Sequence, residues 1–180
     1  MRVTKEQMAE HRRRILEAAG RLFREKGFEA VTVAEVMQAA GLTHGGFYGH
    51  FKSKDELIAQ TLEQIRTVHP EGATLADYAA GYLTEAHRDE HAGGCSFAAL
   101  GGDTIRQSPE ARAAMTERLR RQIARLTALA PGRTEAEKRK AALAGWSAMV
   151  GALVLARISD DPELSRELLD GTRDRIAKAQ

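Results

Sequence analysis

The sequence predicts an all-α protein. Hydrophobic residues make up 43% of the 180 residues and charged residues 29%, whereas aromatic residues account for only 5%. Ala, Leu, Arg and Glu dominate, and this composition favours packed helices over sheets. Apolar residues recur at helical spacing, and Gly or Pro separate the periodic segments. A chain of this length and apolar content is able to bury a hydrophobic core.

Charge is distributed unevenly along the chain. The net charge is +2, but residues 1–54 hold 10 Lys and Arg against 6 Asp and Glu, while residues 55–180 hold 17 against 19. This asymmetry suits a basic N-terminal module that meets a polyanion, joined to a module that does not.

The chain has no features of a secreted or membrane-spanning protein. Cys95 is its one cysteine, so no intrachain disulfide can form. No apolar run approaches the ~18 residues of a membrane span, and the N-terminus lacks the apolar block of a secretory signal. We expect a cytoplasmic protein.

Four helices are predicted in the first 70 residues. The first spans about 7–26 and stops at Gly27; the second spans about 33–40, with Thr32 and Glu35 at capping-box spacing. A third short helix follows Thr43 as its cap. The fourth begins at Lys54, after Ser53, which forms a further capping box with Glu56, and runs until Pro70.

Longer helices are predicted over the remainder of the chain. Glycine pairs, prolines and a capping box of Thr134 with Glu137 mark their boundaries. The predicted ranges are 75–90, 96–106, 109–129, 134–157 and 163–178.

Residues 43–51, Thr-His-Gly-Gly-Phe-Tyr-Gly-His-Phe, form the most distinctive segment. Two short helices separated by a Gly-Leu turn are typical of a helix-turn-helix, whose second helix can enter the major groove of DNA. Phe47 and Phe51, four residues apart, are predicted to pack against the first and fourth helices. Glycines on the opposite side let the backbone approach base edges and phosphates.

This region resembles the DNA-binding signature of the TetR family of bacterial transcriptional regulators. The resemblance covers about residues 8–62, through I-L-E-A-A-G-R-L-F-R-E-K-G-F-E-A-V-T-V-A-E-V and G-L-T-H-G-G-F-Y-G-H-F-K-S-K-D-E-L. It implies an all-helical homodimeric repressor, with an N-terminal three-helix helix-turn-helix DNA-binding domain and a larger C-terminal helical ligand-binding and dimerisation domain. We expect the domains to span 1–53 and 54–180, with the fourth helix as connector.

The resemblance also implies roles for individual residues. Positions that contact phosphate in the family correspond to Thr32, Tyr48, His50 and Lys54. Positions that read bases in the family correspond to Thr43, His44 and Gly46, and Gly45 is a further DNA-binding candidate because its missing side chain lets the backbone approach. Val33, Ala34 and the two glycines offer fewer hydrogen bonds to bases than some relatives do, so the operator sequence is not predicted.

Two apolar stripes near the C-terminus are candidates for dimerisation. Residues 143–154 are apolar over a wide helical face with interspersed glycines, and residues 164–176 carry a second stripe. Both stripes can also face the chain's own core. The resemblance implies that the last two long helices pair with those of a second copy as a four-helix bundle. Because one short helix reads too few base pairs, a dimer on a palindromic operator is expected.

Cys95 is the centre of a predicted effector site. It follows Gly93-Gly94 and precedes an apolar helix, where the helix N-terminus favours a thiolate. Its G-C-x-x-x-A-L pattern is similar to one in TetR-like regulators that sense electrophiles or oxidants, although a small buried packing role is the alternative. An unknown small-molecule inducer is the other expected effector. The predicted ligand-binding residues are Tyr78, Tyr82, Cys95, Phe97, Met115 and Trp146, with Ile105 and Leu119 as further candidates for the cavity wall.

Other functional classes fit the sequence less well. His87, His91 and Cys95 recur every four residues, but the glycines separate the cysteine from the histidines, so no metal or other cofactor is expected. A Cys95 enzyme with His87 or His91 as base lacks an orienting third group, and we expect no catalysis. A helical adaptor that uses its helix-turn-helix to contact protein is the remaining alternative; it predicts weak salt dependence of binding.

Overall fold

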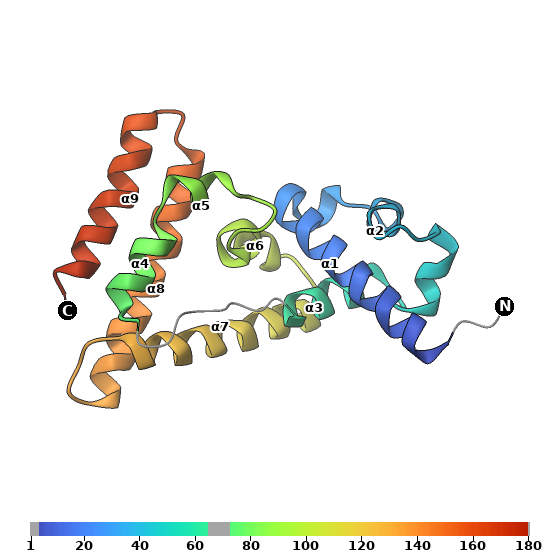
Figure 1. The fold of residues 1–180 in the computed structure, drawn as a ribbon, viewed down its shortest axis with the longest axis horizontal. Coiled ribbons are helices and arrows are strands. Elements are labelled where there is room, and N and C mark those ends of the chain that lie inside the picture. The colour runs from blue at the N-terminus through green and yellow to red at the C-terminus, as the bar shows by residue number, and fades with distance from the viewer. Residues whose placement is uncertain (1–3, 65–72, 180) are drawn as a thin grey trace. The chain divides into compact units, whose positions relative to one another are not determined.

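The computed structural model describes residues 4–64 and 73–179, and every regular element within these ranges is a helix (Figure 1). The all-α prediction is therefore confirmed. The elements are α1 (Lys5–Ala30), α2 (Val33–Ala39), the 3-10 helix η1 (His44–Gly49), α3 (Lys54–Gln64), α4 (Leu75–Tyr82), α5 (Glu85–Asp89), α6 (Ser96–Thr104), α7 (Pro109–Leu129), α8 (Glu135–Ile158) and α9 (Pro162–Ala177).

The described residues form two compact units. The first contains residues 4–64 and Ala99–Arg118, and the second contains residues 73–98 and 119–179. The predicted domain boundary between residues 53 and 54 stays a prediction.

Helix α1 is the scaffold of the first unit and packs against α2 and α3. It begins earlier than predicted because Thr4 and Gln7 form a capping box at its start. Gly27, the predicted stop, interrupts the helix with a φ of 80° and a ψ of 168°. A Cβ atom at Gly27 would also lie 2.7 Å from Oδ2 of Asp103. Both the backbone conformation and the close carboxylate therefore require glycine at this bend.

The second and fourth predicted helices start where the sequence indicates. Thr32 and Glu35 form the predicted capping box of α2. At the start of α3, Oγ of Ser53 accepts a hydrogen bond from the Glu56 N–H (3.1 Å), but the Glu56 carboxylate accepts from the N–H of Lys52 (2.7 Å) and not from Ser53. The predicted end of this helix near Pro70 lies outside the described residues.

The third predicted helix differs from the expectation in two ways. It is a 3-10 helix, and Thr43 precedes it without the predicted side-chain capping bond. Three of its six residues are glycines, each of which disfavours an α-helix by about 1 kcal/mol relative to alanine. A short 3-10 segment held by packing is the form that remains accessible to such a sequence.

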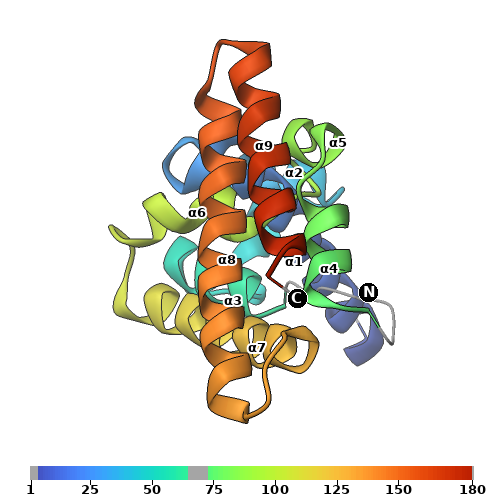
Figure 2. The same ribbon diagram turned by 90° about the vertical axis from the view of Figure 1, so that its left-hand side faces the viewer.

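Helices α8 and α9 run antiparallel in contact with each other in the second unit, and α4 packs against both (Figures 1 and 2). Their facing sides share a core that includes Trp146, Met149, Leu153 and Leu169. A Cβ atom at Gly145 would lie 3.0 Å from Cδ2 of Leu75, so this glycine allows α4 to lie close to α8.

The predicted single helix over 75–90 is wrong, because the chain breaks between α4 and α5. Leu83 has φ −91° and ψ 68°, which is outside the helical region. Thr84 then begins α5 by accepting a hydrogen bond from the N–H of His87 at 3.1 Å. A threonine that bonds to the backbone three residues ahead favours a new helix start over continuation of the helix before it.

Helix α8 is long and apolar enough to cross a membrane by length and composition alone. A core helix of a soluble protein has the same properties. Its buried side chains, among them Trp146 and Met149, belong to the core of the second unit. This burial accounts for the apolar composition of one face of α8.

Candidate functional site

The helix-turn-helix consists of α2, a tight turn and η1. Gly41 has a φ of 66°, which favours glycine at this turn. Phe47 and Phe51 are 1% and 2% exposed, and their rings stack with centroids 5.7 Å apart. The prediction that these two side chains are buried is confirmed.

The opposite side of η1 is exposed and has little side-chain bulk. Gly45 and Gly49 have no neighbouring atom within 4 Å of a Cβ position, and Gly46 has only ordinary van der Waals neighbours. Thr43 and His44 are exposed at the start of the same segment. The structure thus brings the four residues predicted to lie near bases, 43–46, onto one open stretch of backbone.

Arg12 holds this segment in place, a role that the sequence analysis did not assign. Its guanidinium group donates hydrogen bonds to the carbonyl oxygen of His50 and to Oε1 of Gln60. The same group lies 4.5 Å above the centre of the Phe51 ring, within the range of a cation–π contact. Arg12 therefore links α1 to η1 and α3. Its position in the run Arg12-Arg13-Arg14 was the available signal, but nothing in the sequence distinguishes it from its neighbours.

The residues predicted to contact phosphate have different local environments. Tyr48 is 73% exposed, with its ring edge against Phe47. His50 is half-buried at the end of η1. Nζ of Lys54 lies 3.4 Å from the carbonyl oxygen of Glu29, a weak contact that leaves the ammonium group available to an anion.

Thr32 is already engaged within the chain. Its N–H and hydroxyl both donate to Oε2 of Glu35, at 2.8 and 3.0 Å. The hydrogen bonds from the Thr32 backbone and side chain lower the pKa of the Glu35 carboxyl, and Lys26 adds to this effect. A phosphate contact by Thr32 stays a prediction, and it requires the hydroxyl to exchange its partner.

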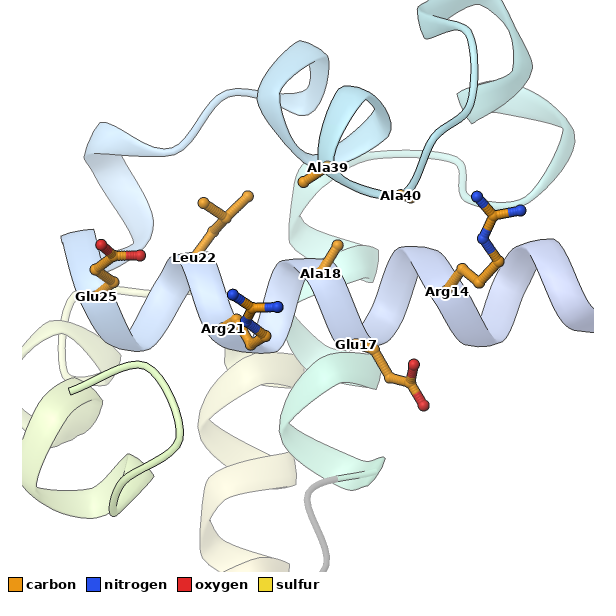
Figure 3. Close-up of a pocket in the computed structure, with 8 residues that line it drawn as sticks. All are labelled: Arg14, Glu17, Ala18, Arg21, Leu22, Glu25, Ala39 and Ala40. Carbon is orange, nitrogen blue, oxygen red and sulfur yellow. The ribbon is translucent and has the colours of Figure 1, made fainter. Parts of the chain in front are cut away.

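A cleft of about 420 Å³ lies between α1 and the end of α2 (Figure 3). Its charged side chains are two arginines and two glutamates, so the opposing charges balance. The predicted effector residues are not among its lining residues, which are Arg14, Glu17, Ala18, Arg21, Leu22, Glu25, Ala39 and Ala40.

The structure brings five of the six predicted ligand residues together around Trp146 in the second unit. The Trp146 ring centroid lies 5.3 Å from that of Tyr82, 5.6 Å from that of Phe97 and 6.2 Å from that of Tyr78. Cys95 packs against the same core. Met115 belongs to the first unit, and Ile105, also in that unit, is 73% exposed. We call Tyr78, Tyr82, Cys95, Phe97 and Trp146 the aromatic cluster.

Tyr82 carries an unsatisfied polar group in the aromatic cluster. Its side chain is 7% exposed, and its hydroxyl is the one buried side-chain oxygen or nitrogen in the described ranges without a hydrogen-bond partner. Burial, followed by the neighbouring Cys95 side chain, raises the pKa of Tyr82 above its usual value. Cys95 therefore lies near the hydroxyl without forming a hydrogen bond with it.

Hydrogen bonds from Arg157 hold the loop before Cys95 in place. The sequence did not indicate this role for Arg157. Its guanidinium group donates to the carbonyl oxygens of Arg88 (2.9 Å), His87 (3.0 Å) and Glu90 (3.1 Å). These bonds satisfy carbonyl groups at the end of α5. A Cβ atom at Gly94 would lie 2.2 Å from the Glu90 carbonyl oxygen, so the loop requires glycine there.

The histidines near this loop have other contacts. Nδ1 of His87 lies 2.7 Å from the carbonyl oxygen of Tyr82, and the two rings are in edge contact. His91 is exposed. Within residues 4–64 and 73–179, no group of three or more His, Cys, Asp or Glu side chains is arranged to hold a metal ion.

The described residues define a class: helical proteins with an N-terminal helix-turn-helix. Residues 15–61 match the family model of bacterial regulatory proteins of the tetR family. Over this N-terminal segment the chain is similar to the TetR family.

Curated relatives match over part of the chain. The chain is 39% identical over 69 residues to the HTH-type transcriptional regulator TtgR of Pseudomonas putida, which covers 38% of this chain and 33% of TtgR. It is 40% identical over 62 residues to the regulator AcrR of Shigella flexneri. This match covers 34% of this chain and 29% of AcrR. The match thus spans about a third of the length of these relatives.

Solved structures resemble the chain over nearly its whole length. E. coli NemR in its reduced form aligns with a TM-score of 0.74 and 21% identity, covering 93% of this chain and 95% of NemR. A TetR family regulator from Agrobacterium tumefaciens aligns with a TM-score of 0.71 and 19% identity. The alignment covers 94% of this chain and 98% of that regulator. At these identities the likeness establishes the fold of both parts of the chain.

We predict that Tyr82→Phe stabilises the protein. The substitution removes a buried hydroxyl without a partner and keeps the ring, so the free energy of unfolding rises by about 1 kcal/mol. Tyr78→Phe is the matched control, because the Tyr78 hydroxyl accepts a hydrogen bond from Nε2 of the buried Gln122 at 3.1 Å. Loss of this hydrogen bond lowers the free energy of unfolding by about 1 kcal/mol. Urea unfolding measures both, and a destabilised Tyr82→Phe variant would contradict the assignment.

Proposed function

We propose that the protein is a DNA-binding transcriptional repressor of the TetR type. The observation that carries the proposal is the two-sided η1 segment, with two buried phenylalanines on one side and an open, glycine-rich backbone on the other. A backbone without side chains allows close approach to a groove, and packing of the rings compensates for the low helix propensity. The family model that matches residues 15–61 and the names of the curated relatives support the same function.

Each residue of the interface has a proposed role. Tyr48, His50 and Lys54 bind backbone phosphates, and Thr32 joins them after exchange of its Glu35 contact. Residues 43–46, Thr43 to Gly46, face the bases. Phosphate contacts position the protein, and only the base-facing residues distinguish sequences. The family implies a regulator and not an enzyme, and we propose that it acts in the cytoplasm.

The double substitution Tyr48→Ala with Lys54→Ala is expected to weaken DNA binding at least about tenfold. It is also expected to reduce the slope of log K against log salt by about 1, since one fixed cationic contact is lost. Fluorescence anisotropy with an upstream DNA fragment at several salt concentrations measures both quantities. Lys140→Ala, which removes an exposed lysine of α8, is the control and leaves both unchanged. Wild-type binding that is insensitive to salt would favour the adaptor alternative.

Homodimerisation is proposed through the outer sides of α8 and α9. Four of the seven exposed large hydrophobic residues in the described ranges, Leu143, Leu155, Ile158 and Leu164, lie on these two helices. The exposed or half-buried small residues Ala144, Ala148 and Gly151 continue the stripe at helical spacing. Such a stripe permits close packing of helices from a second copy into a four-helix bundle. Two-fold symmetry then predicts a palindromic operator.

Leu155→Glu is expected to convert the dimer to a monomer, because it places a charge in the apolar interface. Light scattering after size-exclusion chromatography gives the mass. Leu119→Glu is the matched control: Leu119 on α7 is 40% exposed and Leu155 is 48% exposed. If both the Leu155→Glu protein and the Leu119→Glu control are dimers, the dimer interface is not at Leu155.

Release from DNA is proposed to follow events at the aromatic cluster. The unpartnered Tyr82 hydroxyl offers a donor to a small-molecule inducer, and the rings around it offer an apolar surface. Alternatively, modification of the Cys95 thiol repacks the same cluster. Either event releases the operator only to the extent that it stabilises the conformation that does not bind DNA over the one that does.

Cys95→Ser separates the two routes. If thiol modification is the signal, hydrogen peroxide or an α,β-unsaturated carbonyl releases wild-type protein from DNA at doses that leave the Ser variant bound. Electrophoretic mobility shift measures release, and mass spectrometry of the intact protein measures modification. Equal dose responses of the two proteins would eliminate Cys95 as the sensor and leave reversible ligand binding.

A further inference from the structure

Two histidines from different elements meet at the proposed DNA interface. His11 lies on α1, and His50 lies at the end of η1. Their ring centroids are 6.0 Å apart with an interplanar angle of 71°. Both side chains are half-buried and retain access to solvent. The sequence analysis assigned no role to His11.

The contacts of Arg12 hold the two rings beside each other. Arg12 follows His11 in α1, donates to the carbonyl oxygen of His50 and lies against the Phe51 ring. The backbone at His50 is therefore tied to the residue that follows His11 in α1.

The surroundings of His50 disfavour its protonation. Burial, His11 and Arg12, in this order, lower the pKa of His50. Glu10, the carboxylate in electrostatic range of His11, already accepts two hydrogen bonds from Arg13, at 2.6 and 2.8 Å. On α3, Gln60 and Glu56 bond to each other at 2.9 Å, and Glu56 also accepts from Lys52. The neighbouring carboxylates are thus engaged with other groups.

We propose that His11 and His50 together bind one phosphate of the operator backbone, and that formation of the complex takes up protons. This inference rests on the proposed DNA-binding function. Imidazolium N–H groups donate to phosphate oxygens, and the negative phosphate removes the repulsion between two protonated rings. Because the bound state holds more protons than the free state, lower pH strengthens DNA binding. His11 becomes a DNA-contact residue of α1, outside the helix-turn-helix.

The pH dependence of DNA affinity tests the proposal. At constant ionic strength, the association constant of the wild-type protein is expected to rise about tenfold from pH 8 to pH 6, since each proton taken up contributes up to tenfold per pH unit. His11→Gln reduces this rise to about threefold or less. His50→Gln has the same effect on the rise. His91→Gln, at an exposed histidine of the second unit, retains the wild-type profile.

Nuclear magnetic resonance provides a second readout that needs no variant to stay folded. The C2–H signals of His11 and His50 are titrated in the full chain, with and without duplex DNA. Their pKa values are expected to rise by about one unit in the complex. An unchanged His11 pKa, or a wild-type pH profile in His11→Gln, overturns the inference. A different result would contradict the proposed function itself: wild-type protein that shows no salt-dependent DNA binding at any pH.

Discussion

Burial of Phe47 and Phe51 is the constraint on which the rest of the DNA-binding unit depends. Three glycines in η1 give the segment little intrinsic helicity, so its shape must come from packing. The two stacked rings and the guanidinium group of Arg12 supply that packing from the side of α1 and α3. The same arrangement turns residues 43–46 outward. Stability and the proposed DNA contact are thus divided between the two sides of one short segment.

Most of the fold was predictable because its signals are local. Capping boxes at Thr32 and Thr134 and the proline at Pro109 set helix starts within a residue of where they lie. The predictions of helix starts failed at positions where competing local signals are nearly balanced. The helix predicted over 75–90 is broken at Thr84, whose side chain starts a new helix. Thr43 similarly has the sequence of a cap but forms no capping bond.

The candidate sites were predictable to a smaller extent, because their contacts join residues far apart in the chain. Arg12 reaches His50 and Gln60, and Arg157 reaches the carbonyl oxygens of His87, Arg88 and Glu90. No periodicity or spacing identifies which arginine of a basic helix makes such contacts. The aromatic cluster was named residue by residue, but the unsatisfied hydroxyl of Tyr82 emerges only from three-dimensional packing. That hydroxyl is the group to which we propose that an effector binds.

Hydrogen exchange of residues 43–51 is the most direct test of the central claim that the open side of η1 meets DNA. Backbone amide exchange is followed by mass spectrometry, with and without a duplex that the protein has selected from a random pool. The two-sided packing predicts that DNA slows exchange across 43–51, with the phenylalanines buried in both states. Protection confined to other segments, with exchange of 43–51 unchanged, would contradict it.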